Sequence, residues 1–102
     1  MYIAMNRFTV FKTKEEDFRR RWKDRQSRLA ELPGFVEFQL LRCDTDTSDD
    51  SILYASHTVW KSKEDFVRWT KSEQFRDAHK NAGESSGFYA HGPKFEGFES
   101  VI

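Results

Sequence analysis

Hydrophobic and polar residues alternate along the first segment of the chain, from Tyr2 to Phe11. A period of two is typical of a β-strand with one buried face. The face expected to point inward carries Tyr2, Ala4, Asn6, Phe8 and Val10. Asn6 therefore interrupts an otherwise mostly apolar stripe.

The next segment, Lys14 to Leu32, has apolar positions at intervals of three and four, which predicts an amphipathic helix. Its inward stripe is expected to hold Phe18, Trp22, Arg25, Leu29 and Leu32. Pro33-Gly34 then ends the helix.

The remaining pattern predicts three more strands and one more helix. The strands are Phe35 to Arg42, Ile52 to Trp60 and roughly Lys94 to Val101, and the helix runs from about Ser62 to Asn81. The polar stretch Asp44 to Asp50 reads as a solvated hairpin loop, because it lacks the ligand spacing and closing glutamate of a calcium loop. A turn-rich segment, 82–87, precedes the last strand.

The order β-α-β-β-α-β is that of the α+β ferredoxin-like fold, in one domain over residues 1–102. In this fold both helices cover one face of an antiparallel sheet. Ile3, Met5 and Phe11 would then need cover on the opposite face. A second copy of the chain that supplies its own sheet would provide it, so we expect a homodimer.

Composition excludes several classes of function. The 17 Lys and Arg balance 17 Asp and Glu, which argues against binding to nucleic acid or to a membrane surface. No apolar run approaches the ~20 residues of a membrane span, and the single cysteine, Cys43, excludes an internal disulfide. These features fit a cytoplasmic protein. Aromatic residues make up 16% of the chain, so large flat side chains dominate its core.

Trp69 and His79 are the most informative residues of the second helical segment. His79 follows Ala78 and lies one turn before Gly83, so little bulk surrounds it and a flat ligand such as haem could approach its imidazole. Taken alone, each residue is more often structural: Trp69 is at helical spacing from Phe66, and a single histidine is commonly a hydrogen-bonded core residue.

A straight helix would keep these two residues apart. With a rise of ~1.5 Å per residue, ten residues place the side chains ~15 Å apart and on different faces. One porphyrin could meet both only if the helix bends. We therefore predict a break between Thr70 and Glu73, where the Ser72 hydroxyl can cap a new helical turn.

Nearly the whole chain carries a set of motifs: Asn6-Arg7, Leu32-Pro-Gly-Phe35, Thr58-Val-Trp-Lys-Ser-Lys-Glu-Asp-Phe66, Trp69, Lys71-Ser72 and Phe75-Arg-Asp-Ala-His-Lys80. Together they resemble the IsdG-like haem-degrading monooxygenases of the antibiotic biosynthesis monooxygenase superfamily, which are dimeric α+β barrels. The Leu-Pro-Gly-Phe and Val-Trp-Lys-Ser segments are shared widely in the superfamily and specify the fold. Asn6, Trp69 and His79 together mark the haem-degrading branch.

The resemblance implies that haem is both cofactor and substrate, and that the ring is opened with dioxygen and electrons from an external donor, an unidentified reductase, to release iron. It implies that His79 is the axial ligand of the haem iron, that Trp69 presses on the porphyrin and distorts it, and that Asn6 donates a hydrogen bond near the bound oxygen. The chemistry agrees, because imidazole is a good iron ligand, an amide is an uncharged donor and ring distortion changes haem electronics.

Weaker candidates lie on the first helix. The pattern Arg21-Trp22-x-x-Arg25 resembles a segment in which the aromatic residue lines the pocket and a basic residue approaches a propionate. Arg25 is better placed than Arg21, because it falls on the apolar stripe. With Phe75, from the motif that contains His79, the expected haem-binding set is Trp22, Arg25, Phe75 and His79.

The sequence is also compatible with other functions. A cofactor-independent monooxygenase acting on a quinol or an aromatic polyketide would have no use for His79, and a haem carrier or sensor would not need Asn6 and Trp69. A purely structural dimer is compatible with the fold alone. No role is assigned to His57, His91 or Cys43.

Overall fold

The computed structural model describes residues 1–79 and 87–102, except for the side chains of residues 25–27 and 77–79. Its strands are β1 Tyr2–Phe11, β2 Phe35–Asp46, β3 Ser51–Trp60 and β4 Tyr89–Glu99. Its α-helices are α1 Glu15–Arg25, α2 Lys63–Thr70 and α3 Glu73–His79, and 3-10 helices cover Lys12–Lys14 and Gln26–Glu31. The strands pair antiparallel in the order β2-β3-β1-β4. This confirms the predicted ferredoxin-like fold, with the second helix divided in two.

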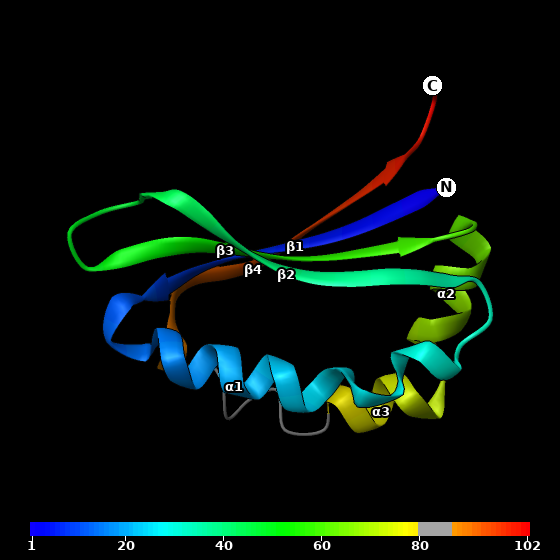
Figure 1. Ribbon diagram of the computed structural model, residues 1–102, viewed down its shortest axis with the longest axis horizontal. Coiled ribbons are helices and arrows are strands. Elements are labelled where there is room, and N and C mark those ends of the chain that lie inside the picture. The colour runs from blue at the N-terminus through cyan, green and yellow to red at the C-terminus, as the bar shows by residue number, and fades with distance from the viewer. Residues whose placement is uncertain (80–86) are drawn as a thin grey trace.

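The molecule has two layers. Figure 1 shows α1 beneath the sheet, α3 next to the 3-10 helix Gln26–Glu31 that follows α1, and α2 at the end where β3 leaves the sheet. In the described part of the chain, no helix covers the upper face of the sheet. None of the described helices has both the length and the apolar character needed to cross a membrane.

β1 follows its predicted alternation along the whole strand. Tyr2, Ala4, Phe8 and Val10 are all buried. Asn6 belongs to the same stripe but is only half-buried. Asn6, the polar residue of this stripe, is therefore accessible from the space beneath the sheet.

The first helix is shorter than predicted. The α-helix ends at Arg25, and the chain tightens into the 3-10 helix Gln26–Glu31 where the sequence predicted α-helix as far as Leu32. Three residues per turn replace 3.6 there, and Leu29 still packs in the cluster that contains Trp60. The apolar stripe could not reveal the change, because it continues through both kinds of helix.

Several strand limits also differ from the predicted ones. β2 runs on to Asp46, which pairs with Ile52, so the solvated hairpin is confined to residues 47–50. β3 begins one residue early, at Ser51, and β4 extends from Tyr89 to Glu99, not from Lys94 to Val101. In each case, pairing with a neighbouring strand supplies backbone hydrogen bonds to residues with little strand propensity of their own.

Aromatic side chains fill the space between the layers in two clusters of buried residues. The first contains Phe8, Val10, Phe18, Trp22, Ile52 and Tyr54. The second contains Tyr2, Ala4, Leu29 and Trp60. The centroid of the Phe18 ring lies 5.0 Å from that of Tyr54 and 5.5 Å from that of Phe8, so α1 is anchored to both central strands by aromatic contacts.

A polar contact fixes the beginning of α1 against the sheet. Glu15 Oε1 accepts hydrogen bonds from the hydroxyl of buried Tyr54 at 2.6 Å and from Arg42 Nε at 2.7 Å. The hydrogen bond from Arg42, followed by that from Tyr54, lowers the pKa of Glu15 below its ordinary value of 4.5. A carboxyl whose folded-state pKa is lowered stabilises the fold above its ordinary pKa, and this contribution is lost as the pH falls through the folded-state pKa.

Glu15→Gln should therefore lower the free energy of unfolding at pH 7 by about 1 kcal/mol, because hydrogen bonds to a neutral acceptor are weaker than those to a carboxylate. The difference from wild type should shrink as the pH falls below 4.5. Urea unfolding at a series of pH values measures both effects.

Glu16→Gln is the matched control, because the Glu16 side chain is 88% exposed and its contact with Arg20 is 3.5 Å long. This variant should match wild type throughout. An unchanged stability of Glu15→Gln at pH 7 would show that the contact is not stabilising.

Candidate functional site

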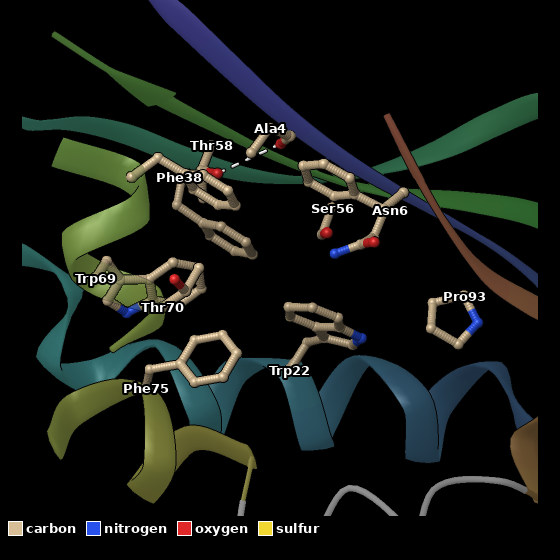
Figure 2. Close-up of a pocket in the computed structure, with 12 residues that line it drawn as sticks. Ala4, Asn6, Trp22, Phe38, Ser56, Thr58, Trp69, Thr70, Phe75 and Pro93 are labelled. Atoms are coloured by element: carbon tan, nitrogen blue, oxygen red, sulfur yellow. Dashed lines mark hydrogen bonds between the residues drawn. The ribbon is translucent and has the colours of Figure 1, made fainter. Parts of the chain in front are cut away.

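A cavity of about 330 Å³ lies between the sheet and the helices, within the range of about 300–1,000 Å³ usual for small-molecule sites. Figure 2 shows its described lining, with side chains from the sheet above and from α1, α2 and α3 below. The lining residues are Ala4, Asn6, Trp22, Phe38, Ser56, Thr58, Phe66, Trp69, Thr70, Phe75, Pro93 and Phe95. None of these carries a charge.

Short side chains on the two central strands leave this space open. Asn6 lies opposite Ser56 and Ala4 opposite Thr58 in the β1–β3 pair. Side chains of one strand point alternately to opposite faces, so these four residues all face the helices. Large aromatic residues elsewhere on the same face hold the helices away from this patch.

Stacked and edge-to-face aromatic rings form the walls. Trp22 stacks on Phe38 with centroids 5.9 Å apart and an interplanar angle of 15°. Trp69 stacks on buried Trp60 at 5.6 Å, and Phe75 meets Trp69 edge-to-face at 4.9 Å. The Trp69 indole is thus held between β3 and α3, and the walls suit a flat, apolar ligand.

The predicted break in the second helix is confirmed. α2 ends at Thr70 and α3 begins at Glu73. The Ser72 hydroxyl donates to the Trp69 carbonyl oxygen at 2.6 Å and accepts from the Phe75 backbone N–H at 3.0 Å. One serine therefore closes the first helix and caps the second, which places Trp69 and Phe75 against the same cavity.

The polar side chains of the lining fall into two groups. Thr58 Oγ1 donates to the Ala4 carbonyl oxygen at 3.3 Å, and Thr70 Oγ1 donates to the Val67 carbonyl oxygen at 2.6 Å. Asn6 and Ser56 have no side-chain hydrogen-bond partner within the described residues. In Figure 2 both point into the cavity from adjacent strands, so their hydrogen-bonding groups are directed at whatever occupies it.

The structure brings four of the predicted site residues to one cavity: Asn6, Trp22, Trp69 and Phe75. Arg25 ends α1 and His79 ends α3, and the side chains of both lie outside the described ones. The predicted roles of these residues remain predictions.

Sequence reasoning missed Ser56, Thr58, Phe38 and Phe66 as lining residues. The alternation of β3 carried part of the signal, because Ser56, Thr58 and Trp60 share one face. Their position beside Asn6 depends on the register between β1 and β3, which the sequence pattern did not provide.

The sequence profile of one family, antibiotic biosynthesis monooxygenase, matches residues 1–81. The chain is 29% identical over 86 residues to a haem oxygenase (staphylobilin-producing) of Staphylococcus haemolyticus, an alignment that covers 84% of this chain and 80% of that protein. It is 36% identical over 56 residues to a haem-degrading monooxygenase of Bacillus cereus, covering 55% of this chain and 50% of that protein.

Solved structures of several other proteins share the fold. The haem degrader MhuD of Mycobacterium tuberculosis, solved with two haems in its active site, has a TM-score of 0.69 at 24% identity, and the match covers 100% of this chain and 97% of that one. SnoaB of Streptomyces nogalater, a cofactor-independent oxygenase, has a TM-score of 0.70 at 23% identity, and the match covers 99% of this chain and 93% of that one. The same fold thus occurs in a haem degrader and in a cofactor-independent oxygenase.

Proposed function

The chain belongs to the antibiotic biosynthesis monooxygenase family, and from that premise we propose that it is a haem-degrading monooxygenase. The carrying observation is the aromatic-walled cavity in which Asn6, from a central strand, lies across from the aromatic group formed by Trp69 and Phe75. Similarity to two proteins named for haem degradation supports the choice of substrate.

The described residues fit a porphyrin. Trp22 and Phe75 offer flat apolar surfaces, and Asn6 offers an unpartnered amide. We propose that Trp22, Phe75, Arg25 and His79 would hold the ring, with Arg25 binding a propionate and His79 binding the iron. When bound, haem supplies the iron that activates dioxygen, with electrons from an external donor, and is itself the molecule oxidised.

Asn6 and Trp69 have separate tasks in this proposal. The Asn6 amide would donate a hydrogen bond to an oxygen atom of the bound ligand, and because the amide is neutral it would not act as an acid. Trp69 exerts steric force on the ring, and its stacking on Trp60 gives that force a rigid support. The surrounding aromatic residues keep bulk water away from the reacting groups.

Haemin added to the purified protein should produce a Soret band that decays when a reductant is supplied in air. His79→Ala should abolish the five-coordinate haem spectrum and turnover while the circular dichroism spectrum stays unchanged, because the axial bond is lost and the fold is not.

The matched control is His91→Ala, because His91 is an exposed histidine on β4. It should behave as wild type. Unchanged haem affinity and degradation in His79→Ala would remove His79 from the site.

Asn6→Ala and Trp69→Ala should still bind haem but degrade it slowly, since neither residue ligates iron. Loss of one oriented donor commonly costs ~2.7–4 kcal/mol of transition-state stabilisation, so Asn6→Ala should turn over at roughly a hundredth of the wild-type rate or less. Single-turnover absorbance decay measures this.

For Trp69→Ala, the magnetic-resonance signature of ferric haem should shift toward that of a planar ring, and Trp69→Phe should retain part of the wild-type effect because the force is steric. Wild-type rates of haem degradation in both alanine variants would contradict the roles assigned to Asn6 and Trp69.

The second candidate is a cofactor-independent oxygenase acting on a quinol or an aromatic polyketide. It is favoured by one observation: every described lining residue is neutral, which suits an uncharged aromatic substrate better than a dicarboxylate such as haem. The haemin experiment separates the candidates. The absence of any Soret band supports this enzyme, and a band that persists under reductant and air supports a haem carrier or sensor.

We also propose that the chain is a homodimer joined through the open face of the sheet. Ile3 and Met5 are only half-buried there, and Phe98, which pairs with Ile3, is 45% exposed. A sheet from a second copy would cover these apolar side chains.

Sedimentation velocity should therefore show a dimer for wild type and a monomer for Phe98→Glu, because a charge buried in an apolar interface is costly. Val101→Glu is the control, since Val101 is 88% exposed and lies beyond β4, and it should remain dimeric. A monomeric wild type, or an equally stable dimer of Phe98→Glu, would overturn the proposed interface.

A further inference from the structure

Ser56 lines the cavity with a hydroxyl that no other described residue engages. The three buried polar side chains of the described residues are Ser51, Ser56 and Thr58, each at most 7% exposed. Ser51 Oγ is 2.7 Å from Ser48 Oγ, and Thr58 Oγ1 donates to the Ala4 carbonyl oxygen. Ser56, at 6% exposed, has no such partner among the described residues. The buried side-chain atoms without a hydrogen-bond partner among the described residues are His57 Nδ1, Trp60 Nε1 and Glu96 Oε1. The Ser56 hydroxyl is not one of these and borders the cavity, so its placement toward an open space requires an explanation.

The position of Ser56 supplies one. It is directly opposite Asn6 in the β1–β3 pair, and side chains so placed have Cβ atoms about 4.5–5.5 Å apart. The same cross-strand row continues to Leu40 on β2 and Phe95 on β4. Ser56 and Asn6 therefore form one polar spot in an otherwise apolar row, and Figure 2 shows both directed into the cavity.

We propose that the Ser56 hydroxyl is a second ligand-binding group of the cavity, which hydrogen-bonds the same polar atom as Asn6. This inference rests on the proposed haem-binding function. An amide N–H only donates, whereas a hydroxyl both donates and accepts. The pair can thus hold a small ligand that carries an oxygen or nitrogen acceptor, such as dioxygen or azide, and distinguish it from an apolar one.

The test uses azide as the probe and Ser56→Ala as the variant, with two measurements. The first is the melting temperature of the protein without haem. Since the hydroxyl has no partner in the fold, Ser56→Ala should melt at the same temperature as wild type or higher. Ser51→Ala, which removes a paired hydroxyl from the same strand outside the cavity, should melt lower.

The second measurement is the dissociation constant of azide from the haemin-loaded protein, followed by absorption. Ser56→Ala should weaken azide binding roughly threefold to tenfold, the range of a single hydrogen bond. Ser56→Thr, which keeps the hydroxyl, should recover most of the affinity, and Ser51→Ala should equal wild type.

Three results would overturn the inference. If Ser56→Ala melts lower by as much as Ser51→Ala, the hydroxyl is structural. If haemin binds and Ser56→Ala holds azide as tightly as wild type does, the inference fails while the proposed function stands. If wild type forms no Soret band with haemin, the proposed function fails and the role of Ser56 fails with it.

Discussion

Along the central pair of strands, Asn6 lies opposite Ser56, and Ala4 lies opposite Thr58. This register decides which side chains face the helices, because a slip by one residue would turn each of them to the open face of the sheet. The cavity forms where short side chains of the two strands lie opposite each other. Its polar spot exists only because the two unpartnered side chains are neighbours. The aromatic contacts of α1 with Phe8 and Tyr54 depend on the same register.

The cavity is lined both by rigidly packed side chains and by polar side chains that have no hydrogen-bond partner among the described residues. Trp69 is held by stacking on Trp60 and by its backbone contact with Ser72. Asn6 and Ser56, in contrast, have hydrogen-bonding capacity that the described residues leave unused. Both groups border the cavity, so a molecule inside it can form the hydrogen bonds that the protein does not. Polar groups of this kind between fixed aromatic walls are features that small-molecule sites share.

The division of the second helix links fold and site. A continuous helix from α2 into α3 would carry Phe75 away from Trp69, but the ring centroids of these residues lie 4.9 Å apart. Ser72 stabilises this turn because its one hydroxyl serves both helix ends. The hydrogen bonds of one serine side chain thus set the shape of this cavity wall, and aromatic side chains form its surface.

The sequence by itself determined the elements and much of the site. The alternation in β1, the stripe of Phe18 and Trp22, and the capping serine at position 72 are local patterns, and each led to the observed element. Asn6, Trp69 and Phe75 were also identified from the sequence, through resemblance to a family. Only the tertiary structure decided three features: the extension of β2 to Asp46, the early start of β4 at Tyr89 and the placement of Ser56 opposite Asn6. These depend on hydrogen bonds and neighbours contributed by strands distant in the sequence, which no local period of two or of 3.6 residues contains.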